Sequence, residues 1–402
     1  MNILSVHNRY LQRGGEDSAR EAEIRLLRDR GHTVIEYCRS NEEIPVDGLG
    51  AKLGLAAGAI WSRRSYQEMR SVLRSERPDV AHFHNVQPLI SPSAYYACDD
   101  LGVPVVQTLH NYRLLCPGAY FLRDGEICEA CFGKSLPIAA IRHGCYKGSR
   151  MATATVAATN VLHRVRGTWE RRIASYIALT SFARTKFIAA GFAPERIFVK
   201  PNAVYPEPVP RRGTGEFALY LGRLSQEKGV HILAQSWRSL SAAVPLRVAG
   251  DGPLRAEVER TVRAAISRSH DVLFYGAVSN GEALALLCGA RFLVAPSICY
   301  EVFPMAVAEA FAAGVPVIAS NIGALAEMVR DGVTGCLVHP NDPEDLSKKV
   351  SWAWNHPEEL SRMGGAAQAE FQEKYSASAN YQKLIEIYER AVTGSAGMRK
   401  CG

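Results

Sequence analysis

Two basic residues and two glutamates follow β-like runs in the second half of the chain. Arg223 and Lys228 come after one such run, and Glu301 comes after another, eight residues before Glu309. An arginine and a lysine that face the same ligand can neutralise a diphosphate without a metal ion. The chemistry indicated is recognition of a phosphorylated ligand, and two solvated surface cations are the alternative for Arg223 and Lys228.

The segment between the two glutamates adds to this interpretation. It contains Phe303, Pro304 and Met305, and Pro304 suits the start of a helix, where its missing N–H is no loss. Glu301 is then expected in the loop before the helix, and Glu309 one to two turns inside it. The start of a helix attracts phosphate through its free N–H groups and its dipole.

The spacing of the two glutamates matches one class of ligand. Eight residues of helix span roughly 12 Å, so one carboxylate can bind hydroxyls on each side of a central diphosphate. A nucleotide-diphosphate-sugar has that order of ribose, diphosphate and sugar. The alternative is one loop acid and one exposed helix acid with no shared ligand.

Several other motifs are excluded by a missing residue. Gly133-Lys134-Ser135 lacks the earlier glycine of a phosphate-binding P-loop, because Cys128 stands there. Gly250-Asp251-Gly252 has Arg255 where a dinucleotide fingerprint needs its third glycine. No two aspartates are spaced i and i+2, so the simplest carboxylate pair for a metal-bound diphosphate is missing.

Four of the ten cysteines gather in one glycine-rich stretch, and they are Cys116, Cys128, Cys131 and Cys145. Four thiolates can hold a tetrahedral structural zinc ion that cross-links an irregular segment. The intervals of 11, 2 and 13 residues differ from a tandem Cys-x2-Cys pattern. Reduced cysteines without a metal are therefore the alternative.

The elements that must position these residues are short β-branched runs alternating with amphipathic stretches, which is typical of parallel α/β sheets. The first series of expected strands is 3–6, 33–37, 80–83, 103–109, 176–180 and 197–200. The second series is 217–221, 246–249, 272–275, 292–295, 315–318 and 336–338. Ligands of doubly wound sheets bind beyond the carboxyl ends of the strands, which is where the charged residues stand.

The domain organisation follows from the two series. The expected arrangement is a first domain over 1–205 with a cysteine-rich insertion at 113–150, a proline-rich linker at 206–214 and a second domain over 215–375. A C-terminal helix is expected at 376–402; its sequence leaves its packing partner open, and the first domain is one candidate. The fold class is α/β, with two doubly wound Rossmann-like domains facing across a cleft that is the default site.

Composition excludes other classes. The 402 residues are 47% hydrophobic and 22% charged, which is ordinary for a globular protein. The N-terminus lacks a secretory signal and no run suits a membrane span, so a cytoplasmic location is expected. The net charge is +7, but without a recognised binding motif a nucleic-acid partner is not expected.

Most of the positive charge is concentrated in one segment. From residue 142 to 172 the only carboxylate is Glu170, and the basic residues are Arg142, Lys147, Arg150, Arg164, Arg166, Arg171 and Arg172. The stretch 151–166 has a helical pattern with an apolar face, and Trp169 follows it. This pattern predicts peripheral contact with an anionic membrane surface, and a solvated basic helix is the alternative.

Four motifs together resemble the retaining family 4 glycosyltransferases over nearly the whole chain. They are Leu-Gly-Arg223-x4-Lys228-Gly, Gly250-Asp-Gly252, Glu301-x7-Glu309 and Asp331-Gly-x-Thr-Gly335. Gly14-Gly15, the segment 78–85 and Thr108-Leu-His110-Asn111 are similar to the acceptor-side domain of that family. The resemblance implies the two-domain GT-B fold, a nucleotide-diphosphate-sugar donor and metal-independent transfer of a hexosyl group to a glycan or lipid-linked acceptor in cell-surface polysaccharide or glycolipid synthesis.

The same resemblance implies roles for individual residues. Arg223 and Lys228 would bind the diphosphate, Glu301 the donor sugar and Glu309 the ribose, while His110 would face the reacting sugar. Gly14 and Gly15 would let backbone N–H groups approach phosphate, and Phe303, Pro304 and Met305 would line the donor site. Catalytic roles are expected of His110, Arg223, Lys228 and Glu301.

Two departures from the family pattern concern the donor sugar. Val302 and Pro304 replace glycines that are common in the family, and Pro304 removes a backbone N–H.

The alternatives to a transferase are a non-catalytic protein and an epimerase- or phosphorylase-type enzyme of the same fold.

Overall fold

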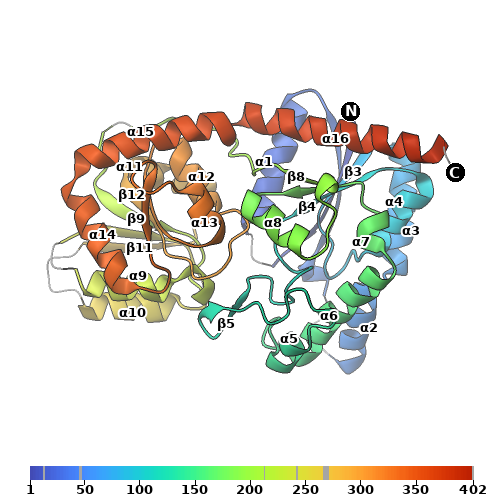
Figure 1. Ribbon diagram of the computed structural model, residues 1–402, viewed down its shortest axis with the longest axis horizontal. Helices are drawn as coiled ribbons and strands as arrows, with labels where there is room; N and C mark the ends of the chain where they lie inside the picture. Colours follow the sequence, from blue (N-terminus) through green and yellow to red (C-terminus); the bar gives the residue numbers. More distant parts are fainter. Residues whose placement is uncertain (12–13, 45–47, 212, 241–242, 266–270, 401–402) are drawn as a thin grey trace. The chain divides into compact units, whose positions relative to one another are not determined.

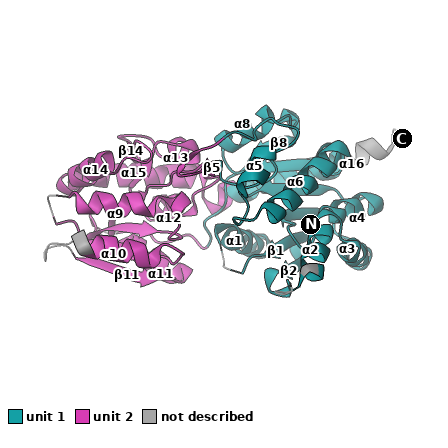
Figure 2. Ribbon diagram, turned by 90° about the horizontal axis from the view of Figure 1, so that it is seen from below, with its two compact units in different colours: residues 1–121, 129–205, 380–402 teal, residues 122–128, 206–379 magenta. Residues whose placement is uncertain are grey.

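The chain forms two compact units. The computed structural model describes residues 1–11, 14–44, 48–211, 213–240, 243–265 and 271–400. Unit 1 comprises Met1–Phe121, Glu129–Tyr205 and Asn380–Gly402, and unit 2 comprises Leu122–Cys128 and Pro206–Ala379 (Figure 2).

Unit 1 contains a six-stranded parallel sheet in the order β2-β1-β3-β4-β7-β8, of which Figure 1 labels β3, β4 and β8. Its strands are β1 (Asn2–Arg9), β2 (Thr33–Ser40), β3 (Val80–Asn85), β4 (Val105–Leu109), β7 (Ser175–Ala178) and β8 (Ile197–Val199). In the centre of the sheet Ile3 is opposite Val34 on one side and Val80 on the other. These apolar side chains are buried, as expected for parallel strands covered on both faces.

Helices connect the strands of unit 1. They are α1 (Gly15–Asp29), α2 (Leu49–Ile60), α3 (Arg63–Glu76), α4 (Ser93–Leu101), α5 (Ile138–His143), α6 (Arg150–Val165), α7 (Thr168–Arg171) and α8 (Ser181–Ala189). Ser62, Ser149 and Thr180 cap α3, α6 and α8 by accepting a hydrogen bond from a backbone N–H of the first turn.

The last helix, α16 (Ala377–Lys400), belongs to unit 1 from Asn380 onward. The Asn380 side chain donates to the carbonyl of Pro201, and the Tyr388 hydroxyl lies 2.7 Å from Nδ1 of His82. Tyr388 is fully buried, so this part of α16 belongs to the core of unit 1.

Unit 2 repeats the architecture, with a parallel sheet in the order β11-β10-β9-β12-β13-β14. Its strands are β9 (Phe217–Leu221), β10 (Leu246–Ala249), β11 (Val272–Gly276), β12 (Ala290–Ala295), β13 (Val317–Ser320) and β14 (Gly335–Val338). A short antiparallel hairpin of β5 (Leu122–Arg123) and β6 (Glu126–Ile127) also belongs to this unit, and Leu122 packs against its core.

The helices of unit 2 are α9 (Val230–Arg238), α10 (Arg255–Ala265), α11 (Asn280–Gly289), α12 (Met305–Ala312), α13 (Gly323–Met328), α14 (Pro343–Asn355) and α15 (Pro357–Lys374). Leu233 of α9 packs with Leu246, Val248 and Phe292 of the sheet, and all four are fully buried. The two doubly wound sheets expected from the sequence are therefore confirmed.

The strand orders locate the ligand-binding edge of each sheet. In unit 2 the first strand, β9, lies between β10 and β12, and in unit 1 the first strand, β1, lies between β2 and β3. The direction of winding reverses beside these strands, and ligands of such sheets bind at the carboxyl ends there. The candidate edges are the ends of β9 and β12 in unit 2, and of β1 and β3 in unit 1.

Candidate functional site

Glycines hold the loops of unit 2 close together. A Cβ on Gly250 would lie 1.8 Å from the carbonyl oxygen of Gly222, and one on Gly252 would lie 2.4 Å from that of Leu224. No side chain fits at either distance. The two glycines therefore allow the turn after β10 to pack closely against the loop after β9. A hydrogen bond from the Leu224 N–H to the Asp251 carbonyl, 3.0 Å long, joins the same two loops.

The loop after β9 is also fixed to the loop after β12. Gly229 has a φ of +66°, and a Cβ there would lie 1.8 Å from the carbonyl oxygen of Pro296. The Ile298 N–H donates to the Glu227 carbonyl at 3.0 Å. These contacts bring the loop that carries Arg223 and Lys228 against the loop that carries Glu301.

Lys228 and Glu301 form an ion pair. Lys228 Nζ donates to Oε2 of Glu301 at 2.7 Å, and the Ser297 hydroxyl donates to Oε1 at 2.5 Å. The Glu301 side chain is 10% exposed and that of Lys228 is 31% exposed. Arg223 is exposed, so an ammonium, a guanidinium and a carboxylate lie in the loops that follow β9 and β12.

Glu309 lies one turn inside α12, which begins at Met305 directly after Pro304. Because Pro304 has no side-chain acceptor, the helix start has no side-chain cap. Burial raises the pKa of Glu309 to about 7. Near neutral pH this carboxyl therefore changes between a hydrogen-bond donor and an anion that only accepts.

The raised pKa of Glu309 predicts a pH-dependent stability. The neutral form contributes stability that is fully present below the ordinary pKa of 4.5 and is lost as the pH rises through about 7. We expect Glu309→Gln to leave the melting temperature nearly unchanged at pH 5 and to raise it by a few degrees at pH 8. Calorimetry at both pH values checks this, and an equal difference at the two values would contradict it.

The residues between the two glutamates are mostly inside unit 2. Phe303 is 9% exposed, and its ring centroid lies 5.9 Å from that of Tyr375. Pro304 is buried, and Met305 is partly exposed. Packing within unit 2 therefore accounts for the Phe303 ring without a ligand.

In unit 1, Gly14 and Gly15 lie at the start of α1. Gly14 is the N-cap, and its N–H donates to Oδ2 of Asp17 at 2.9 Å. A Cβ on Gly14 would meet no described atom nearer than this carboxylate oxygen, at 3.9 Å. Packing among the described residues therefore does not require a glycine here, which leaves room for a ligand to approach the backbone.

His110 follows β4 and contacts a second histidine. Its Nε2 lies 2.9 Å from Nδ1 of His84 on β3, and the two rings stack with centroids 5.2 Å apart. Burial, followed by the charge of the nearby His7 ring, lowers the pKa of His110 to about 3. His110 is therefore neutral at physiological pH and can act as a hydrogen-bonding group, not as a cation.

The four clustered cysteines are each partly exposed. Burial raises the pKa of the Cys116 thiol, while backbone hydrogen bonds from Phe121, Gly118 and Ala119 act in the opposite direction. A Cβ on Gly118 would lie 3.4 Å from Cβ of Cys145 and 3.8 Å from Sγ of Cys116. Among the described residues, the group with three ligand atoms within 4.8 Å of one another is Glu23, His82 and His84, so the zinc site stays a prediction.

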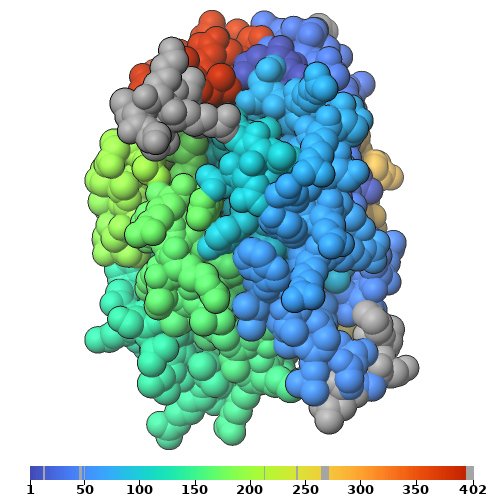
Figure 3. All heavy atoms as spheres, turned by 90° about the vertical axis from the view of Figure 1, so that its right-hand side faces the viewer, coloured from blue at the N-terminus to red at the C-terminus, as the bar shows by residue number. Residues whose placement is uncertain are grey.

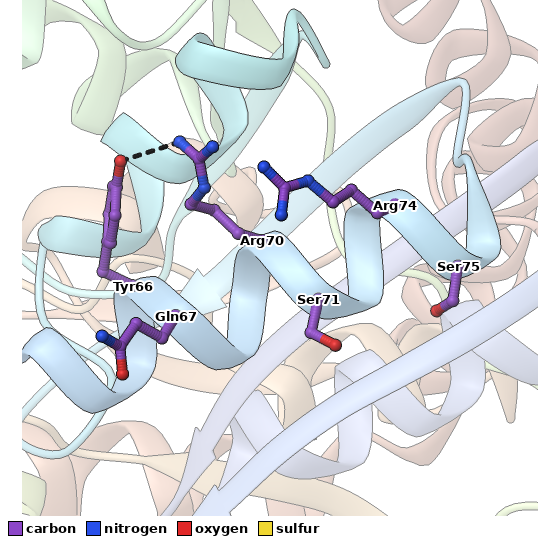
Figure 4. Close-up of a pocket in the computed structure, with 6 residues that line it drawn as sticks. All are labelled: Tyr66, Gln67, Arg70, Ser71, Arg74 and Ser75. Carbon is purple, nitrogen blue, oxygen red and sulfur yellow. Dashed lines mark hydrogen bonds between the residues drawn. The ribbon is translucent and has the colours of Figure 1, made fainter.

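One shallow hollow lies on the surface of α3 (Figure 4). Arg70 is one of its lining residues, and it donates to the Tyr66 hydroxyl at 2.9 Å and pairs with Asp100 at 2.9 Å. The hollow is lined by Tyr66, Gln67, Arg70, Ser71, Arg74 and Ser75. All six come from one helix and none was expected at the site, so we do not assign the site to this hollow.

Sequence reasoning missed the buried polar residues behind His110. They are Glu23 on α1, His82 and His84 on β3, and Lys200 after β8. The alternation His82-x-His84 was a signal, because residues i and i+2 of a strand share one face. Glu23 carried no such signal, since its position on a charged helix suggests a solvated face.

Family models match both halves of the chain. Residues 21–208 match the model described as Glycosyltransferase Family 4, and residues 203–370 match the model described as Glycosyl transferases group 1. The second match spans the loops that hold Arg223, Lys228 and Glu301, and the helix α12 that holds Glu309.

Curated relatives share part of the chain. An uncharacterized glycosyltransferase, MJ1178, of Methanocaldococcus jannaschii is 33% identical over 194 residues, which are 48% of this chain and 54% of that protein. The D-rhamnosyltransferase WbpZ of Pseudomonas aeruginosa is 31% identical over 40% of this chain and 42% of its own length. The chain thus spans about half the length of these relatives.

Solved structures share the fold over most of the chain. Anabaena Alr3699/HepE in complex with UDP and glucose superposes with a TM-score of 0.66 at 18% identity, covering 96% of this chain and 98% of that one. Sucrose-phosphate synthase from Thermosynechococcus elongatus gives 0.71 at 15% identity, covering 98% and 100%. This likeness shows the GT-B fold. The two family matches support a family 4-type glycosyltransferase.

Proposed function

We propose that this protein is a retaining glycosyltransferase that moves a hexosyl group from a nucleotide-diphosphate-sugar to a glycan or lipid-linked acceptor in cell-surface polysaccharide or glycolipid synthesis. The observation that carries the proposal is the Lys228–Glu301 ion pair, with Arg223 in the same loop, beyond β9 and β12. These residues supply two cations for a diphosphate and a carboxylate for sugar hydroxyls.

The proposed reaction needs no nucleophile from the protein. As the bond between the sugar and the diphosphate breaks, negative charge develops on the leaving phosphate oxygen, and Lys228 and Arg223 stabilise it. The acceptor hydroxyl attacks from the same face and gives its proton to that oxygen, so the configuration at the sugar is retained. The two cations carry the charge that a divalent ion would otherwise neutralise.

The function is tested by incubating the full chain with radiolabelled UDP- and GDP-sugars, with lipid-linked and soluble glycan acceptors, with and without EDTA. We expect transfer that survives EDTA and a product whose anomeric configuration, read by NMR, equals that of the donor. Release of nucleotide without transfer, or an inverted product, would contradict the proposal.

We also propose that the four clustered cysteines bind a structural zinc ion. The spacing of Cys128 and Cys131 supports this, and so does Gly118, which lies close to both Cys116 and Cys145. Thiolate ligands would cross-link a loop-rich segment. We expect one zinc per chain by elemental analysis, and less than half of that for Cys128→Ser. Cys38→Ser is the control, and a zinc-free protein after zinc-supplemented growth would end the idea.

We also propose that unit 1 contacts an anionic membrane. Helix α2 packs beside α6, and Figure 3 shows the surface where these segments, in blue and green, adjoin. The two helices expose large apolar side chains, with exposed fractions of 56% at Leu53, 49% at Met151, 40% at Leu162 and 82% at Val165. Exposed Arg150 and Arg166 lie at the ends of α6, which suits a surface-lying element.

Two features of the expected membrane contact are corrected by the structure. Trp169 is only 4% exposed and lies against Tyr95, so it is a core residue and not a surface anchor. Arg172 pairs with Asp99 and covers the Tyr96 ring, which makes it a poor lipid contact. No helix of the described residues is long and apolar enough to cross a bilayer.

Vesicle sedimentation tests the membrane contact. We expect the chain to sediment with anionic but not with zwitterionic vesicles, to be released by salt, and to lose binding in the triple variant Arg142, Arg150 and Arg166→Glu. Each basic residue near an anionic bilayer contributes about 1 kcal/mol, so three reversals remove most of the attraction. The matched control reverses the exposed Arg238, Arg260 and Arg263 of unit 2, and equal loss in both variants would contradict a specific surface.

A further inference from the structure

A buried carboxylate lies behind the histidines of unit 1. Glu23 of α1 has a side chain that is 8% exposed, and its Oε2 accepts from Lys200 Nζ at 2.6 Å. The Lys200 side chain is 2% exposed. Burial would raise the pKa of Glu23, but Lys200 and His82 outweigh burial and hold the pKa well below its usual range. Glu23 is therefore an anion, paired with one buried cation.

The second oxygen of Glu23 faces two histidines of β3. Oε1 lies 3.0 Å from Nδ1 of His82 and 3.6 Å from Nε2 of His84. His82 has other contacts as well, since its Nδ1 lies 2.7 Å from the Tyr388 hydroxyl and its Nε2 lies 2.7 Å from the Thr108 hydroxyl. His84 Nε2 is buried and has no hydrogen-bond partner among the described residues, so the carboxylate is the acceptor it faces.

The other nitrogen of His84 continues the series toward the end of β4. Its Nδ1 lies 2.9 Å from Nε2 of His110. His84 has a 2% exposed side chain, whereas His110 is partly exposed. Glu23, His84 and His110 thus form a line from the inside of the unit to a residue at the ligand-binding edge.

This line determines where the protons are. Burial lowers the pKa of His84 well below its ordinary value, with the neighbouring His82 and His110 acting in the same direction, so each ring of the line is neutral and carries one N–H. The carboxylate draws the His84 proton to Nε2, which leaves Nδ1 as an acceptor. His110 must then donate from Nε2, and its Nδ1 keeps a lone pair.

We propose that Glu23 and His84 are positioning residues that fix His110 as the Nε2–H tautomer, with Nδ1 free to accept a hydrogen bond from a substrate hydroxyl. The tautomer part stands on the geometry of unit 1 alone. The hydroxyl part rests on the proposed function, because it assigns the acceptor Nδ1 to a sugar in the transfer reaction.

The tautomers are measured on the full chain with ¹⁵N-labelled histidine, by long-range ¹H–¹⁵N correlation. We expect the His110 and His84 resonances to show a protonated Nε2 and an unprotonated Nδ1. His163 is an internal reference, because its Nε2 lies 2.9 Å from the Ile60 carbonyl, which can only accept. A protonated Nδ1 on His110 would overturn the proposal.

Two variants interrupt the line at different points. Glu23→Gln with Lys200→Met removes the buried charge pair as a unit, since Glu23→Gln alone would leave the ammonium without its counter-ion. His84→Phe keeps the ring and removes both nitrogens, and it serves if the double variant does not fold. In either variant we expect His110 to become a mixture of tautomers while His163 is unchanged; an unchanged His110 in a folded variant would overturn the proposal.

A control variant and a kinetic measurement distinguish a role of Glu23 and His84 in orienting His110 from a role in stabilising the fold alone. Tyr388→Phe removes the hydroxyl at His82 without touching the line, and we expect it to keep the His110 tautomer and the transfer rate. We expect the double variant or His84→Phe to lower kcat 10- to 100-fold with the donor KM within twofold. A normal kcat in a folded variant would overturn the positioning role. Absence of transfer by the wild-type chain would instead count against the proposed function, and the tautomer measurement needs no activity.

Discussion

Changing Arg223 or Lys228 to Ala should weaken the binding of nucleoside diphosphates by about 10- to 100-fold. Charge-assisted hydrogen bonds of this kind contribute about 1.5–3 kcal/mol each. Arg223 is exposed, whereas Lys228 is paired with Glu301 at 2.7 Å. We therefore expect the melting temperature to be unchanged in Arg223→Ala and slightly lower in Lys228→Ala, where Glu301 loses its ion pair and keeps the hydrogen bond from Ser297. Titration calorimetry with UDP and GDP, in EDTA, measures the affinities.

The matched control for these variants is Arg260→Ala, which removes an exposed arginine from α10 of the same unit. Its affinity for both nucleotides should equal that of the unchanged chain. Normal affinity in both Arg223→Ala and Lys228→Ala would contradict the assignment of the diphosphate site to this loop. An absolute requirement of binding for a divalent ion would contradict it as well.

Glu301→Gln should lower kcat by about 100-fold or more and change the donor KM little. The glutamine keeps the shape that fits Ser297 and Lys228 but removes the charge, which weakens interactions that strengthen only in the transition state. Glu309→Gln should have the opposite signature, a raised donor KM with nearly unchanged kcat, because the ribose is remote from the bond that breaks. Initial rates over a range of donor concentrations separate the two.

If Glu301→Gln raised the donor KM and Glu309→Gln lowered kcat, the roles assigned to the two carboxylates would be exchanged. Full turnover by Glu301→Gln would show that Glu301 is not part of the site.

The donor KM of the unchanged chain should also fall as the pH rises through about 7, because Glu309 then ionises and accepts from both ribose hydroxyls. That dependence should be absent in Glu309→Gln.

The strands could be predicted because buried parallel strands are nearly continuous apolar runs. The run predicted at 315–318 begins two residues later in the structure, at Val317. The shift has a physical cause, since Pro316 has no N–H and contributes only its carbonyl, which accepts from Leu293. Local pattern is therefore a good guide to elements and a poor one to their first residue.

The contacts within the site could not be predicted in the same way. Lys228 meets Glu301 because Gly229 packs on the carbonyl of Pro296, a contact between distant positions that no local pattern encodes. Glu23 and Lys200 are 177 residues apart and both nearly fully buried. Hydrophobic periodicity assigns charged residues to the surface, so a buried ion pair becomes visible only when the fold brings its members together. Trp169 shows the converse, an aromatic residue beside basic ones that belongs to the core.

The return of α16 to unit 1 has a consequence for the order of biosynthesis. The ribosome releases residues 1–205 first, and these contain all six strands of the first sheet. The core of unit 1 is completed only when Tyr388 contacts His82 and Asn380 reaches Pro201. Unit 2 consists of the short hairpin at 122–128 and the continuous segment 206–379. All of unit 2 is therefore synthesised before most of the last helix is made. The domain that is synthesised first is therefore the one that finishes folding last, and a messenger cut short before codon 380 would leave that domain with an open core in the nascent chain.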